Sequence, residues 1–286
     1  MLRELKILLL LIIVVGIIYW GVEPLAHSIM HPKVAPADYE FKDLDKIDLS
    51  KGDAQKGKKL VTENCTACHG IKAEKINPPM DNASSASSYG VVPPDLSNIA
   101  AVLDHNFLAN FIKNPVKATE LSHKFGDSNP YPMPGYDWMS DDEISDIVAY
   151  LASIASKNLS DKDVFTQACD RCHSIRYDKM VALTPDADLE RYLGTKAPDL
   201  SMMIRSRGPK ELSVFINNPQ KMIPNTPMPR VGLTQQAEKQ VISYLEKVGD
   251  SKKAQRDSLG IKIMIFFAVM ALLAYAWKRK IWSDLH

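Results

Sequence analysis

Four cysteines occur in the sequence, as the pairs Cys65/Cys68 and Cys169/Cys172. Each pair is followed at once by a histidine, His69 or His173, so the pattern C-x-x-C-H occurs twice. Cysteines three positions apart on a helical turn share one face, and their sulfurs can bond two vinyl groups on one edge of a porphyrin. The next residue lies on the same side and can offer its imidazole to the iron. The spacing predicts two covalently attached haem c groups, with His69 and His173 as proximal ligands.

Paired cysteines also occur in zinc sites and in thioredoxin-like redox sites. A zinc site needs a second pair of Cys or His ligands at close spacing, and neither motif has one. A thioredoxin-like pair belongs to a β-α-β pattern, which the sequence does not show around either motif. The haem interpretation is therefore favoured over both.

Two methionines are candidates for the sixth iron ligand. Met133 in "YPMPGY" and Met228 in "TPMPRV" follow the two motifs, and flanking prolines stiffen each loop. His/Met ligation raises the haem potential, as an electron carrier needs. His105 or His123 is the alternative for the first haem. Three other methionines have no matching methionine in the other half of the chain: Met80, Met139 and Met222.

The soluble region is a duplication. "NCTACHG", "PPDLS" and "FIKNP" return as "ACDRCHS", "APDLS" and "FINNP", each 104 residues later. The Met-Pro pairs return after 95, so the first copy carries about nine extra residues. Ser140 with Glu143 predicts a capped amphipathic helix at the end of the first copy, and residues 241–248 predict its counterpart. Residues 77–90 are expected to form a mobile insert without a counterpart. We expect an all-α fold.

Two apolar segments flank this region. Residues 5–22 are long enough to cross a bilayer, a cleavable signal peptide being the alternative. Residues 259–277 form the second span, followed by the basic cluster 278–280. Both basic flanks predict cytoplasmic termini, with the haem domains in the periplasm of a bacterium and the spans in its inner membrane. The predicted domains are a span (1–22), a juxtamembrane segment (23–50), two haem domains (51–155 and 156–250), a linker (251–258), a span (259–277) and a tail (278–286).

The tandem unit resembles small class I cytochromes c over most of residues 51–250. The resemblance implies that the carbonyls of Pro94 and Pro198, in the repeated P-D-L, bond the second nitrogen of each proximal histidine. Basic C-terminal tails are typical of the cytochrome c subunit of quinol–cytochrome c reductase, the cytochrome bc complex. The start, "YWGVEPLAHSIMHP", is similar to the diheme reductase subunits of Campylobacter-like bacteria.

This resemblance implies an electron relay without a catalytic residue, from the Rieske iron–sulfur protein to a soluble cytochrome c. A cytochrome b subunit and a dimeric complex are the further expected partners. The diheme subunit of a cbb-type oxidase and a free membrane-tethered carrier are the alternatives, and two matched methionines argue against a diheme peroxidase. A net charge of +1 argues against a nucleic-acid binder.

The two haem domains differ in charge. Residues 51–155 carry 9 basic and 13 acidic side chains, net −4, and residues 156–250 carry 14 and 12, net +2. Five acidic residues after the Met133 loop form a candidate patch for steering a basic carrier. A helix N-terminus that favours acids is the alternative explanation. The five residues are Asp137, Asp141, Asp142, Glu143 and Asp146.

Overall fold

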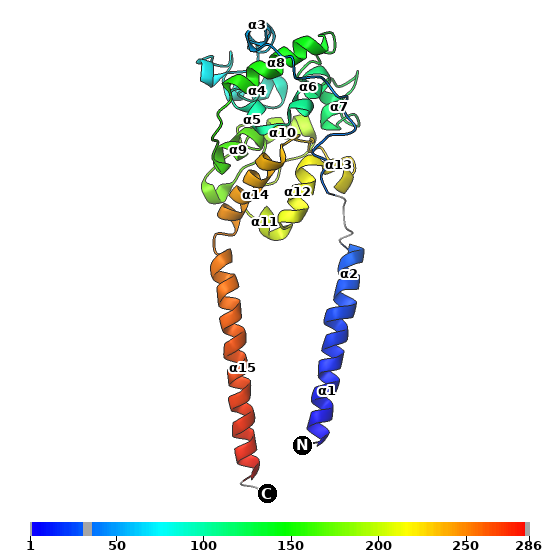
Figure 1. Ribbon diagram of the computed structural model, residues 1–286, viewed down its shortest axis with the longest axis vertical. Coiled ribbons are helices and arrows are strands. Elements are labelled where there is room, and N and C mark those ends of the chain that lie inside the picture. The colour runs from blue at the N-terminus through cyan, green and yellow to red at the C-terminus, as the bar shows by residue number, and fades with distance from the viewer. Residues whose placement is uncertain (1, 31–35, 284–286) are drawn as a thin grey trace.

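A computed structural model of the chain describes residues 2–30 and 36–283. It shows a helical head and two long helices that leave the head side by side, so that their far ends lie on the same side of the molecule (Figure 1). The described residues contain isolated β-bridges and no strand, which confirms the expected all-α class. The predicted residues 284–286 of the tail lie outside the described part.

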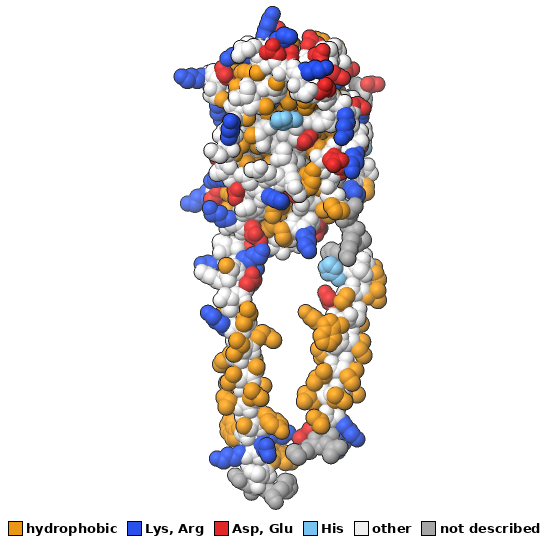
Figure 2. Space-filling view, viewed as in Figure 1, with side chains coloured by type: hydrophobic (Ala, Val, Ile, Leu, Met, Phe, Trp, Pro, Cys, Tyr) orange, Lys and Arg blue, Asp and Glu red, His pale blue; other side chains and the backbone are white. Residues whose placement is uncertain are grey.

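The two long helices are apolar enough and long enough to cross a membrane. The first consists of α1 (Leu2–Ile17), a π-turn (Ile18–Val22) and α2 (Glu23–Met30); the second is α15 (Lys253–Ser283). Both helices extend beyond the apolar segments 5–22 and 259–277, because the polar residues that flank these segments are also helical. Hydrophobic side chains cover both helices (Figure 2). Near their far ends, Lys278 Nζ lies 2.7 Å from Glu4 Oε1.

The first half of the head is built on the crossing of α3 and α8. Ile144, Ile147, Val148 and Leu151 of α8 are buried, and its capping box at Ser140 is present as predicted. The remaining helices fold around this crossing. The helices of this half are α3 (Ala54–Asn64), a 3-10 turn (Lys72–Glu74), α4 (Asn82–Tyr89), α5 (Ile99–Val102), α6 (His105–Lys113), α7 (Pro115–Thr119) and α8 (Asp141–Ile154).

The second half repeats this arrangement, with α14 packed against α9 where α8 packs against α3. The helices of this half are α9 (Asp161–Ala168), a 3-10 turn (Arg176–Asp178), α10 (Asp186–Leu193), α11 (Met203–Ser206), α12 (Pro209–Asn217), α13 (Pro219–Met222) and α14 (Gln235–Gly249). The expectation for residues 77–90 was wrong. They contain α4, whose counterpart 104 residues later is α10, and the two helices pack together.

Residues 36–50, which follow the N-terminal helix in the sequence, contact both halves of the head. Phe41 is fully buried, with its ring 5.2 Å from that of Phe107 in the first half. The Tyr39 hydroxyl donates to Glu238 of α14, at 2.7 Å. Phe41 has a φ of 46°, a strained value for an aromatic residue that burial of the ring offsets. Phe41 and Leu44 of this segment are therefore part of the core.

Arg230 joins the second half to this segment and to the first half. Its side chain is 3% exposed and donates two hydrogen bonds to Asp43, at 2.9 and 2.7 Å, and one to the Ala118 carbonyl, at 2.9 Å. The guanidinium also lies over the rings of Phe41 and Phe107, 5.6 and 6.0 Å from their centres. Arg230 is thus the polar centre of the contact between the halves.

Gly57 in α3 permits the close crossing with α8. A methyl group there would lie 1.9 Å from the Asp146 carbonyl oxygen, so we expect Gly57→Ala to destabilise the protein by about 2–3 kcal/mol, although alanine normally favours a helix. Denaturant unfolding measures this. Gly126→Ala, where nothing lies within 4 Å, is the control and should change stability little. If Gly57→Ala were more stable than the native protein, the close contact between α3 and α8 at this position would be contradicted.

Candidate functional site

The two C-x-x-C-H segments have the same backbone geometry. Each follows a helix, α3 or α9, and continues it as a tight turn. The His69 amide donates to the Cys65 carbonyl at 3.0 Å, and the His173 amide donates to the Cys169 carbonyl at the same distance. The turn brings both cysteines and the histidine to one side, as the spacing predicts.

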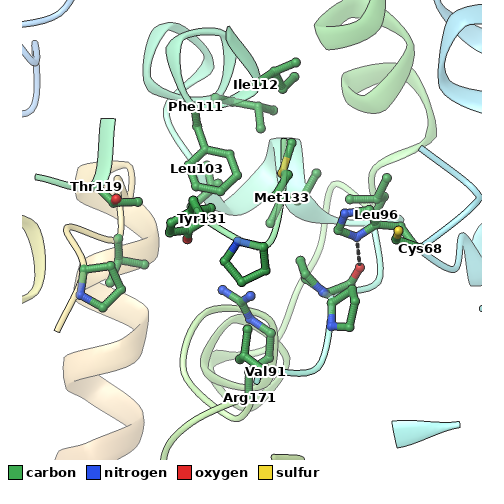
Figure 3. Close-up of a pocket in the computed structure, with 18 of the residues that line it drawn as sticks. Cys68, Val91, Leu96, Leu103, Phe111, Ile112, Thr119, Tyr131, Met133 and Arg171 are labelled. Atoms are coloured by element: carbon green, nitrogen blue, oxygen red, sulfur yellow. Dashed lines mark hydrogen bonds between the residues drawn. The ribbon is translucent and has the colours of Figure 1, made fainter. Parts of the chain in front are cut away.

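Both histidine rings are held by a proline carbonyl. His69 Nδ1 lies 2.8 Å from the Pro94 oxygen (dashed line in Figure 3), and His173 Nδ1 lies 2.9 Å from the Pro198 oxygen. Nδ1 must carry the proton to donate to a carbonyl, which leaves Nε2 with its lone pair free to bind a metal. Burial lowers the pKa of both histidines although these hydrogen bonds raise it, so both rings stay neutral near pH 7.

The Asp and Ser of the repeated P-D-L-S hold the proline loops in place. The Asp95 carboxylate accepts from the Lys72 amide at 3.1 Å, and the Ser97 hydroxyl accepts from the Ala73 amide at 2.9 Å. Asp199 and Ser201 make the equivalent bonds in the second half. The resemblance to class I cytochromes c implies a role for the proline alone. The repetition of the whole motif was the available signal for the other two residues.

One continuous cavity runs between the two halves of the head and receives both motifs. Its walls are mainly apolar and include Leu96, Leu103, Phe111 and Ile112, several of which are drawn with Met133 in Figure 3. Pro198 is the one predicted site residue that does not line it. The predicted residues that do are Cys65, Cys68, His69, Pro94, Met133, Cys169, Cys172, His173 and Met228.

The other candidate ligands are placed less favourably, with one exception. His105 lies at the start of α6, where its Nε2 is 2.9 Å from the Ala100 carbonyl, and His123 is exposed; neither lines this cavity. Met139 does line it and is buried, although it has no counterpart in the second half. Met133 and Met228 are the matched pair within the cavity.

The cysteines are free thiols in the structure. Burial raises the pKa of Cys65 to about 11 and that of Cys169 to about 12, so both stay protonated. A thioredoxin-like site needs the opposite, a thiolate with a lowered pKa. Within the described residues no cluster of three or more His, Cys, Asp or Glu side chains could hold a metal.

The arrangement fits a covalently bound haem on each side. Paired thiols on one face of a turn can form thioethers, a neutral imidazole with its lone pair free can bind iron, and the apolar walls can cover a porphyrin. A haem held in this way supplies reversible one-electron chemistry at its iron. The protein's own contribution is to fix the histidine ring and to exclude water.

The acidic residues after the Met133 loop are mostly engaged in local structure. Asp146 is buried and accepts from the Asp53 amide at 2.6 Å, and Asp141 pairs with Lys113 at 2.5 Å. Glu143 forms the capping box of α8 with Ser140. These contacts favour the alternative explanation, the acid preference of a helix N-terminus.

Residues 54–155 match the cytochrome c family. A comparison with curated proteins finds no match. Among solved structures, the chain is similar to one described as "Hyperthermophilic respiratory Complex III", with 18% sequence identity and a TM-score of 0.31 over 96% of this chain and 99% of that one. The family match coincides with the first set of Cys, His and Pro residues and with α3–α8. The first half of the head is a cytochrome c domain, a haem-binding electron carrier.

Proposed function

We propose that the chain is a diheme c-type cytochrome. The observation that carries this proposal is the second C-x-x-C-H turn, which repeats the geometry of the first and opens into the same cavity. Cys169, Cys172 and His173 would hold the second haem, and Met133 and Met228 would complete the two iron sites. With two His/Met sets neither iron keeps an open position, so the protein transfers electrons and activates no substrate.

Residues close to the two attachment segments are in direct contact. Gln167 of α9 donates to the Asp95 carbonyl at 2.5 Å, and the Val92 amide donates to the Thr184 hydroxyl at 3.1 Å. Residues that flank the second motif therefore pack on the proline loop of the first half. This packing supports electron exchange between the two haems within one chain.

We further infer that the head is held at the outer face of a bacterial inner membrane by both long helices, with both termini cytoplasmic. Basic residues at the far ends of the two helices support this orientation. The proposed role is that of a quinol–cytochrome c reductase subunit, which takes electrons from the Rieske protein and passes them to a soluble cytochrome c. A second span supports docking to a cytochrome b subunit, because it fixes the head more tightly than a single anchor.

Mild detergent extraction, with haem spectra and identification of the co-purifying subunits, tests this role. We expect a b-type cytochrome and a Rieske protein to accompany a chain that carries two haems c. Co-purification with a copper-containing oxidase subunit would instead assign the chain to a terminal oxidase. Isolation of the chain alone would favour a free membrane-tethered carrier.

A further inference from the structure

Arg171 belongs to the second attachment motif but reaches the first domain. It lies between Cys169 and Cys172, and its side chain lines the shared cavity. In Figure 3 it lies beneath the loop that carries Tyr131 and Met133. His69 and Met133 line the same cavity as Arg171, which places the guanidinium on the side of the first haem position.

The guanidinium is incompletely paired. Its Nε is buried and has no hydrogen-bond partner, and no ion pair of Arg171 occurs within residues 2–30 and 36–283. The neighbouring Asp170 is buried, and no ion pair joins it to Arg171 within the described residues. A buried guanidinium nitrogen without a hydrogen-bond partner is unfavourable, so the unpaired Nε of Arg171 inside a cavity indicates a missing ligand, and an anion suits its charge.

Two tyrosines complete a set of donors beside Arg171. Tyr131 and Tyr192 line the same cavity as Arg171. Their rings pack on Phe125, with centres 5.1 and 5.3 Å away. A phenol hydroxyl can donate one hydrogen bond. A guanidinium fork with phenol hydroxyls beside it is a donor set suited to a carboxylate.

We propose that Arg171, together with Tyr131 and Tyr192, binds a propionate carboxylate of the haem held by the first domain. A residue of the second attachment motif then holds the first haem. The equivalent position of the first motif is Ala67, 104 residues earlier, so the duplication does not repeat this site. The inference rests on the proposed diheme function and adds a difference between the two haems.

A cation at this place should raise the potential of the first haem, because it favours the state with one more electron. We expect Arg171→Gln to lower that potential, shifting its ferrous-to-ferric ratio about tenfold, or ~59 mV for one electron. Arg171→Lys should keep most of the potential, since it keeps the charge. It should still shift the infrared carboxylate band of the propionate, because the guanidinium fork is lost.

Redox titration of the purified full-length chain tests the proposal, with the first haem assigned by a Met133→His variant. Arg176→Gln is the matched control, because Arg176 is in the same domain but its side chain is 81% exposed. A shift confined to the second haem, or an equal shift in the control, would overturn the proposal. Fewer than two haems per chain would overturn the diheme function itself; two haems with unchanged potentials and carboxylate bands would overturn only the role of Arg171.

Discussion

Replacing Cys169 and Cys172 together by serine should reduce the covalently bound haem from two groups per chain to one. Serine oxygen cannot replace sulfur in the thioether bonds, and under the proposed function the two thiols are the attachment atoms of one of two separate turns. Intact-chain mass spectrometry, with haem quantification on the same sample, measures the result. The loss should be complete for one haem, because the Cys65/Cys68 turn keeps its own set of donors.

The converse variant, with serine at Cys65 and Cys68, is the matched control and should also retain one haem. A variant with serine at all four cysteines should retain no covalently bound haem. A native chain that carries a single haem would contradict the assignment of the second turn, whereas unequal losses would show that one domain needs the other for haem attachment.

Arg230→Met should destabilise the head by about 3 kcal/mol, because it removes a buried cation with three hydrogen bonds at the junction of both halves and the juxtamembrane segment. Arg230 stands two residues after Met228, so the same change should loosen that loop and weaken the sulfur-to-iron absorption band of the second haem. Thermal unfolding and the visible spectrum measure the two effects. Arg207→Met, at an exposed arginine paired with Glu211 at 2.8 Å, is the control.

The Arg230 variant should also respond differently to acid. The hydrogen bonds from Arg230 hold the pKa of Asp43 below its usual 3.8. A carboxyl whose folded-state pKa is lowered contributes stability above its unfolded pKa, and that stability is lost as the pH falls through the folded value. Between pH 5 and 3 the native head should therefore lose more stability than Arg230→Met does. Equal slopes would show that the pair adds nothing.

Local chemistry made much of the site predictable. The C-x-x-C-H turns depend on spacing within five residues, and the Met133 and Met228 loops follow from the register of the repeat. The capping box at Ser140 is equally local. Each of these features is encoded within a short segment, so one sequence is enough to recognise it.

The features that the sequence did not reveal depend on contacts between distant segments. The helices α4 and α10 are equivalent in position but share almost no residue types, so the repeat did not expose them. Arg230 and Asp43 meet across 187 positions of sequence. A lone buried arginine leaves no pattern, and its partners become visible only in the folded chain.

The packing of α4 on α10 joins equivalent elements of the two halves of the head. Arg191 donates to the Ser87 carbonyl at 3.1 Å, and these residues stand at equivalent positions, 104 apart. Contacts between equivalent positions are characteristic of two-fold interfaces in homodimers. The head thus has the form of a two-fold dimer within one polypeptide. Where the first half has Ala67 and Gly135, the second half has Arg171 and Arg230, and these two arginines make the two halves chemically different.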